Sequence, residues 1–195
     1  METALQDYLN GLCCSAPPNT SYNFDVESSN WSSLGVTDQA SFNFALNVTT
    51  NNFKITGNKI EANIISDLGT LNIIGASITK VNYLSYNSSL GNIQLSIASN
   101  QIFNFSPSTL GNFSSLILDN NQITTINFPL GWQPSNWIGL RFNQLTNDSY
   151  SNMETWANSL GFSTGKDIFF NGNIDPISGT NLKTILESKG WTVFG

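Results

Sequence analysis

The sequence contains no histidine, and only 10% of its 195 residues are charged. Without histidine the chain cannot form a Ser-His-Asp triad, a Cys-His pair, an HExxH zinc site or a histidine pH switch. The seven Lys and Arg residues are scattered singly in a chain whose net charge is −6. A nucleic-acid-binding protein needs clustered cations to displace counterions from phosphates, so we expect no nucleic-acid partner.

Long apolar runs are also missing. No run of 18 apolar residues occurs, so we expect no membrane insertion. The first residues lack the basic and apolar regions of a signal peptide, and we expect none. Calcium-loop and phosphate-loop motifs are absent as well, which predicts neither a metal nor a cofactor.

The only two cysteines are adjacent, at Cys13 and Cys14. A bridge between neighbours strains the peptide and closes almost no loop, so it would add little stability. We therefore favour two reduced thiols at the end of a helix. Intermolecular cross-linking and a redox role are the alternatives.

Amide and hydroxyl side chains are abundant instead, with 28 Asn, 25 Ser and 17 Thr. Many of the asparagines belong to a repeated pattern, of which the copy from Leu116 to Ile123 reads L-x-L-x-x-N-x-I. Other copies begin at residues 53, 95, 138 and 168, and a weaker one at residue 71 has Ala76 in place of the asparagine. The asparagine column comprises Asn58, Asn100, Asn121, Asn143 and Asn173.

Each part of the pattern has a structural role. Alternating apolar residues direct two side chains inward from a short strand, and the residues between them face outward. The asparagine amide can donate to and accept from the backbone of neighbouring coils, where unpaired polar groups would each cost about 1–3 kcal/mol. Because Ala76 cannot do this, we expect its coil to be irregular or hydrated.

The pattern and its spacing resemble the leucine-rich repeat family over residues 53–175. The resemblance implies a β-rich α/β solenoid with short parallel strands, irregular returns and helical caps at both ends. We expect a single domain over residues 1–195. Its parts are an N-terminal helical and β cap (1–50), the repeats (51–147) and a C-terminal helix-strand-helix-strand cap (148–195).

Both caps are predicted from apolar spacing. At the front, residues 2–12 have the i, i+3, i+4, i+7 spacing of a helix, and residues 19–50, including 41–45, show the alternation of extended chain. At the back, Asp148 or Ser149 is positioned to cap a helix that ends at Gly161. A strand from residue 166, a helix that stops at Gly190 and a final strand from Trp191 follow.

The outward strand positions predict a binding face, because leucine-rich repeat proteins usually bind partners there. The expected binding residues are Lys54, Thr56, Asn72, Ile74, Ser96, Ile117, Asp119, Arg141, Phe169 and Asn171. Asp119 and Arg141 occupy the same column of adjacent coils, which favours an exposed cross-strand ion pair over a catalytic or ligand-binding couple. The five tryptophans are candidates for a sugar platform, although core packing is the default for most of them.

The closing segment from Leu186 to Val193 is similar to those of leucine-rich repeat proteins of tailed bacteriophages and of some environmental bacteria. That similarity implies a non-enzymatic interaction protein that is a structural component of a bacteriophage virion, such as a capsid decoration, head-fibre or tail protein. Its partners would be proteins of a larger assembly, including copies of itself. The alternative is a bacterial surface or extracellular recognition protein that binds a protein, host receptor or glycan on its strand face. An enzyme is disfavoured, because the repeat columns offer only Asp119 as a carboxylate.

Overall fold

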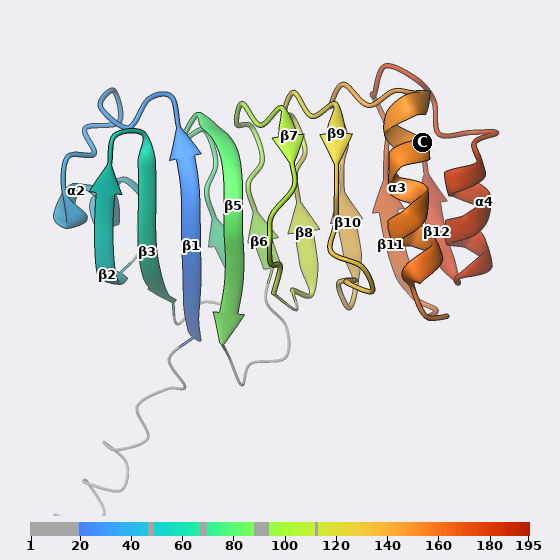
Figure 1. The fold of residues 1–195 in the computed structure, drawn as a ribbon, viewed down its shortest axis with the longest axis horizontal. Coiled ribbons are helices and arrows are strands. Elements are labelled where there is room, and N and C mark those ends of the chain that lie inside the picture. The colour runs from blue at the N-terminus through green and yellow to red at the C-terminus, as the bar shows by residue number, and fades with distance from the viewer. Residues whose placement is uncertain (1–19, 47–48, 67–69, 88–93, 112) are drawn as a thin grey trace, which may run out of the picture.

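A computed structural model of the chain describes residues 20–46, 49–66, 70–87, 94–111 and 113–195. The described residues form three β-sheets around one hydrophobic core. The molecule is elongated, with an antiparallel sheet at its N-terminal end and two helices, α3 and α4, at the opposite end (Figure 1).

Sheet A is antiparallel, and its strand order is β2-β3-β1-β5. Its strands are β1 (Thr20–Ser28), β2 (Thr49–Thr56), β3 (Lys59–Ser66) and β5 (Ile78–Asn87). Strands β2 and β3 form a hairpin in which Thr56 pairs with Lys59 across a two-residue turn. Gly57 has a φ of +60° at the first turn position, where a type II′ turn takes glycine.

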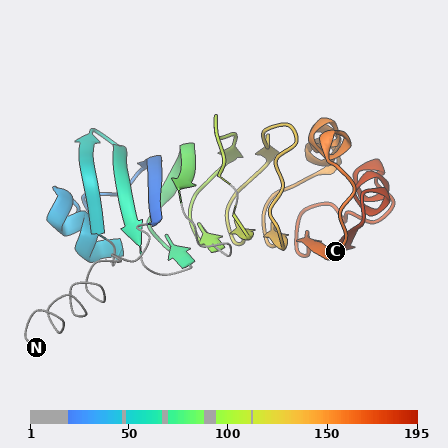
Figure 2. The same ribbon diagram turned by 90° about the horizontal axis from the view of Figure 1, so that it is seen from below.

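Sheet B is parallel, and its strand order is β12-β11-β10-β8-β6-β4. Its strands are β4 (Thr70–Asn72), β6 (Gln94–Ser96), β8 (Ser115–Ile117), β10 (Trp137–Gly139), β11 (Lys166–Phe169) and β12 (Trp191–Phe194). A small parallel sheet C, made of β7 (Asn104–Phe105) and β9 (Thr125–Ile126), lies across the core from sheet B (Figure 2).

Strand β5 joins the antiparallel and parallel parts of the fold. One side of β5 pairs with β1 in sheet A. On β5, Leu84 also receives a hydrogen bond from Gly111 N at 2.9 Å and donates one to Thr109 O at 3.1 Å. Since Leu84 is 1% exposed, the core continues across this junction without a break.

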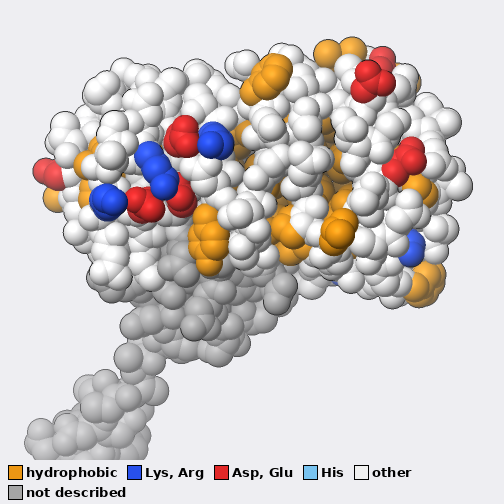
Figure 3. Space-filling view, in the orientation of Figure 1, with side chains coloured by type: hydrophobic (Ala, Val, Ile, Leu, Met, Phe, Trp, Pro, Cys, Tyr) orange, Lys and Arg blue, Asp and Glu red, His pale blue; other side chains and the backbone are white. Residues whose placement is uncertain are grey.

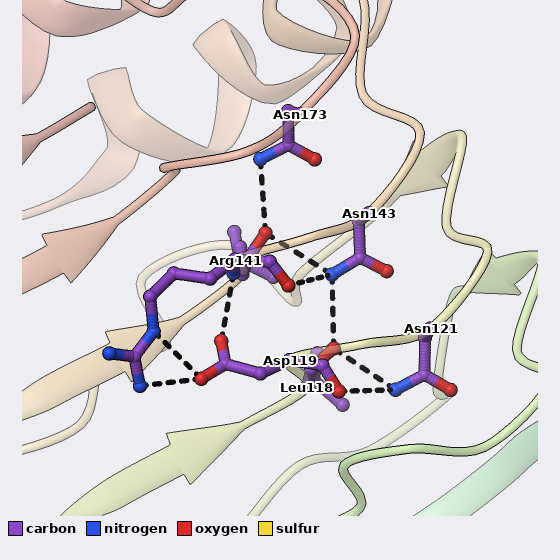
Figure 4. Close-up of polar contacts among 7 residues, drawn as sticks. Leu118, Asp119, Asn121, Arg141, Asn143 and Asn173 are labelled. Atoms are coloured by element: carbon purple, nitrogen blue, oxygen red, sulfur yellow. Dashed lines mark hydrogen bonds and ion pairs between the residues drawn. The ribbon is translucent and has the colours of Figure 1, made fainter.

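A ladder of asparagine side chains connects the turns that follow the strands of sheet B (Figure 4). The Nδ2 of Asn121 donates to Ile97 O and Leu118 O, each at 3.0 Å, and its Oδ1 accepts from Ile102 N at 3.2 Å. Asn100, Asn143 and Asn173 make the equivalent bonds to their own turn and to the preceding one. These four residues therefore have the role that the pattern predicts.

The turn at Ala76, which we expected to be irregular or hydrated, is closed by sheet A instead. Ser28 lies at the end of β1, is 1% exposed, and donates its hydroxyl to Ala76 O at 2.8 Å. Asn100 Oδ1 accepts from Ile78 N on the other side of the same turn, at 3.0 Å. A serine from the antiparallel sheet therefore supplies a hydrogen bond where the asparagine column is interrupted.

The helices are α2 (Gln39–Leu46), α3 (Asn147–Ser159) and α4 (Asn181–Ser188). Helix α3 begins after Thr146, not at Asp148 or Ser149, which both lie inside it. It packs on the core through Trp156, whose Nε1 donates to Trp132 O at 2.7 Å. All four elements expected between residues 148 and 194 are present.

The expected solenoid with helical caps at both ends is wrong. The fold is mixed α/β, and its N-terminal part is an antiparallel sheet. The copy of the pattern at residues 53–60 forms the β2–β3 hairpin, where Asn58 is exposed in the turn and is not part of the ladder. Local alternation of apolar residues is the same in both kinds of strand, and the reversal at Gly57 makes this pair antiparallel.

The extended structure expected at residues 41–45 is also wrong, because these residues lie in α2. Asp38 Oδ1 accepts from Ser41 N at 2.8 Å, which pairs a backbone donor of the first turn. The helix directs Phe42 into the core at 0% exposure and leaves Phe44 91% exposed. The expected helix at residues 2–12, Cys13 and Cys14 lie outside the described residues.

Candidate functional site

The strand register of sheet B places one outward position of every strand in a single row. This row is Asn72, Ser96, Ile117, Gly139, Phe169 and Phe194. Four expected binding residues therefore share one face of one sheet. Asp119 and Arg141 follow β8 and β10 on this face, whereas Ile74 and Asn171 are exposed just beyond β4 and β11.

Lys54 and Thr56 do not belong to this face. Both lie on β2 in sheet A, where Lys54 contacts Glu61 at 3.6 Å. Figure 3 shows charged side chains of both signs gathered over this sheet. A pocket of about 440 Å³ opens beside them, but its carboxylates are already bonded, since Asp25 contacts Lys59 at 3.0 Å and Asn82 Nδ2 at 3.1 Å.

Asp119 and Arg141 form the expected ion pair, in a more buried setting than expected. The Oδ2 of Asp119 contacts Nη2 at 2.6 Å and accepts from Nε at 2.8 Å, while Oδ1 accepts from the backbone N of Arg141 at 2.8 Å (Figure 4). The side chain of Asp119 is only 9% exposed. These three contacts fix the direction of the Arg141 side chain.

Gly139 provides the space for this carboxylate. A Cβ at residue 139 would lie 2.8 Å from Oδ1 of Asp119 and 3.0 Å from Cζ3 of Trp137. Any larger residue would have to displace one of these two side chains. The glycine in the outward row therefore allows Asp119 and the indole to pack against the strand.

Next to Arg141, this face of sheet B carries three aromatic rings, which come from β10, β11 and β12. The guanidinium carbon of Arg141 lies 5.3 Å from the ring centre of Phe169, which stacks at 4.7 Å and 8° on Phe194. Trp137 meets Phe169 at 5.8 Å and 89°. The group of Trp137, Phe169, Phe194, Arg141, Asp119 and Asp167 is called the aromatic site from here on.

A pocket of about 330 Å³ opens at this site, lined by Trp137, Arg141, Asp167 and Phe169. Its volume is near the lower end of the range for small-molecule sites, about 300–1,000 Å³. Asp167 and Trp137 come from adjacent positions of β11 and β10, so the carboxylate stands beside the indole. The pocket thus combines ring surfaces with a fixed donor group and an acceptor group.

The opposite side of β11 faces the core and holds a buried lysine. Lys166 is 7% exposed, donates from Nζ to Pro134 O at 2.6 Å and lies 5.8 Å from the ring centre of Trp191. Burial lowers the pKa of Lys166 below its usual range. This ammonium group points away from the aromatic site, so we assign it a structural role.

Asp167 and Phe194 were missed in the sequence, and Trp137 was predicted only as one of five candidates for a sugar platform, of which the other four are buried in the core. Trp137 and Asp167 directly precede the first apolar residue of their copies, a position that faces outward for the same period-two reason. Applying the alternation one step earlier would have placed both on the outward face. Phe194 lies in β12, which pairs with β11 although its sequence lacks the asparagine of the pattern.

Within the described ranges, no cluster of three or more acidic or cysteine side chains is arranged to hold a metal ion. Among the same residues, no helix is both long and apolar enough to cross a membrane. Comparison with known proteins finds no match, whether with protein-family models, curated proteins or solved structures. The resemblance of the pattern to the leucine-rich repeat family stays a prediction from the sequence.

Proposed function

We propose that the protein is a non-enzymatic recognition protein that binds its ligand at the aromatic site. The observation that carries this proposal is the cluster of Trp137, Phe169 and Phe194 beside an arginine held by Asp119. Tryptophan, tyrosine and arginine are the residues that contribute most often to strong binding sites. Phe194 is 40% exposed, so a ring surface remains in contact with solvent.

The chemistry of the site favours binding over catalysis. The Asp119 carboxylate accepts hydrogen bonds from Arg141 on both of its oxygens, so it is committed to a structural contact. Asp167 is the second carboxylate of the site, and the chain contains no histidine to act with it. General acid–base catalysis needs a free group within reach of the substrate proton, and a paired Asp119 does not provide one.

This proposal is tested by selecting ligands with the wild-type protein and measuring their affinity for a variant with an altered aromatic site. Wild-type protein is presented to a displayed random peptide library and to an oligosaccharide array, and each ligand found is measured again with Phe169→Ala. We expect at least about a tenfold loss of affinity, because this substitution removes a ring that lines the pocket and on which Phe194 stacks.

Phe162→Ala is the matched control, since Phe162 is 74% exposed and lies outside the sheets. It should leave affinity unchanged. The proposal is wrong if neither selection yields a ligand, or if every ligand binds Phe169→Ala as tightly as wild type. Equal thermal unfolding midpoints of the two variants would show that a loss of binding is not a loss of folding.

A second candidate is a subunit of a bacteriophage virion, which the similarity of the closing segment implies. Strands β2 and β12 are the terminal strands of their sheets, and they lie at opposite ends of the elongated molecule (Figure 1). Terminal strands are where a further chain can add to a sheet. This arrangement supports assembly in a row, and the molar mass in solution separates it from a free monomer.

A further inference from the structure

We propose that the ligand of the aromatic site is a saccharide without acidic groups, one ring of which packs in the corner that Trp137 and Phe169 form. This inference rests on the proposed function and adds the chemical class of the ligand. It is carried by the shape of the ring surfaces, the fixed polar groups beside them and the balance of charge in the pocket.

The ring surfaces form a corner. Trp137 and Phe169 meet at an interplanar angle of 89° with their centres 5.8 Å apart. Arg141 and Phe194 each lie over Phe169, and the half-buried indole of Trp137 is the other ring surface that lines the pocket. A sugar ring has an apolar face of C–H groups that packs on an aromatic ring, while its hydroxyls project from the edge.

The polar groups of the pocket match those hydroxyls. A guanidinium group has five N–H donors, and Asp119 contacts Nε and Nη2, which leaves three N–H groups for a ligand. The Asp167 carboxylate supplies acceptors beside the indole. Asp119 holds Arg141 in place before the ligand binds, so ordering that side chain adds little to the entropic cost of binding.

The charges in the pocket select against anionic ligands. Arg141 carries one positive charge, which Asp119 balances at 2.6 Å, and Asp167 adds a negative charge. An anionic ligand would therefore meet a site of net charge −1. A ligand with many hydroxyls and no acidic group avoids this repulsion, and it can bond to both Arg141 and Asp167.

The size of the site favours a small ligand over a folded protein. A stable protein interface buries about 800 Å² on each partner, and an exposed aromatic patch would have to extend along the sheet. On β6 and β8 the outward side chains of Ser96 and Ser115 are only 4% and 2% exposed, so they offer little surface to a partner. The open, ring-lined part is confined to β10, β11 and β12.

Titration with defined sugars tests the inference. The probes are neutral disaccharides (maltose, cellobiose, lactose and di-N-acetylchitobiose), with sialyllactose and digalacturonate as anions. Binding is followed by calorimetry and by the emission of Trp137, compared with a Trp137→Phe variant. We expect at least one neutral disaccharide to bind, and the anionic sugars to bind at least about tenfold more weakly.

Asp167→Asn should weaken neutral sugar binding by about tenfold, and this variant keeps the size of the side chain. The same substitution should reduce the discrimination against the anionic sugars, which a merely structural role would not change. Thr192→Val on the neighbouring strand is the control, because Thr192 is exposed and does not line the pocket. Its affinity should equal that of wild type.

The outcomes separate this inference from the proposed function. If selected peptides bind at the aromatic site and no sugar does, the saccharide inference is overturned and the proposed function stands. Sugar binding that Trp137→Phe and Asp167→Asn both leave unchanged overturns it too, as does equal affinity for anionic and neutral sugars. If no peptide and no sugar binds, both proposals fail.

Discussion

Single amide side chains connect successive turns after the strands of sheet B through hydrogen bonds to their backbone. Asn121 is 7% exposed and bonds to the backbone of two successive turns. Each of these backbone groups is buried, so water does not replace the amide when it is lost. The free energy of unfolding therefore depends on individual asparagines to a degree that an exposed polar residue does not show.

Replacing Asn121 by alanine should lower the free energy of unfolding by about 1–3 kcal/mol. The reason is that Ile102 N and the carbonyl oxygens of Ile97 and Leu118 lose a partner. Urea unfolding, with the midpoint compared at unchanged slope, measures the change.

Asn127→Ala is the matched control for this measurement. Asn127 also makes a short hydrogen bond, from Nδ2 to Ser106 Oγ at 2.7 Å, but both side chains are exposed. Its loss should change the free energy of unfolding by no more than about 0.5 kcal/mol. Equal effects of the two substitutions would contradict the role assigned to the buried ladder.

At the scale of elements, helix α3 is held by polar anchors as well as by its apolar face. Tyr150 is 1% exposed, packs edge-on against Phe170 at 5.4 Å and donates its hydroxyl to Asp175 O at 2.7 Å. Asn147 N donates to Asp175 Oδ2 at 2.9 Å at the start of the helix. The helix is therefore attached to the turn after β11, which also carries Asn173 of the ladder.

The attachment of α3 should weaken at high pH. Burial, followed by the nearby Asp175 charge, raises the pKa of Tyr150 to about 12 from its usual 10.0. A raised pKa in the folded state means that the stabilisation is complete below pH 10 and is lost as the pH rises toward 12. Two pKa units correspond to about 2.7 kcal/mol.

Tyr150→Phe isolates this effect. At neutral pH the variant should be less stable than wild type by about 1 kcal/mol, because Asp175 O loses its donor. Between pH 10 and 12 the wild type should lose stability relative to the variant. Chemical unfolding at a series of pH values measures both, and a constant difference between the two proteins would contradict the assignment.

At the scale of the whole molecule, two kinds of sheet share one core through β5. Buried residues run without interruption from Phe24 in sheet A to Val193 in sheet B. Strands β2 and β12, one terminal strand of each of these sheets, lie at opposite ends of the elongated molecule. Because β12 also carries Phe194, a neighbour that pairs with β12 would lie beside the aromatic site.

If the protein is a virion component, its peptides should be found in purified bacteriophage particles by mass spectrometry. Light scattering of the purified protein should give a defined oligomer or a mass that rises with concentration, because terminal strands pair end to end. A strict monomer at every concentration, together with absence from particles, would contradict assembly and leave the recognition function.

The sequence by itself determined which segments become the strands of sheet B and four of the asparagines that link them, Asn100, Asn121, Asn143 and Asn173. Alternation of apolar residues decides which side chains face the core, and an amide after the strand pairs backbone groups of the next turn. Both signals are local, so residues such as Leu116 and Asn121 could be assigned from the chain alone. The helix-strand-helix-strand order at the C-terminal end could be predicted from local signals in the same way.

Only the tertiary structure decided the direction of pairing and the composition of the aromatic site. The copy at residues 53–60 has the same alternation as the others, but Gly57 reverses the chain and β3 pairs with β1. The site needs Trp137, Phe169 and Phe194 from three strands that are far apart in sequence. Local alternation orients a side chain, whereas the neighbours it meets depend on which strands the shared core brings together.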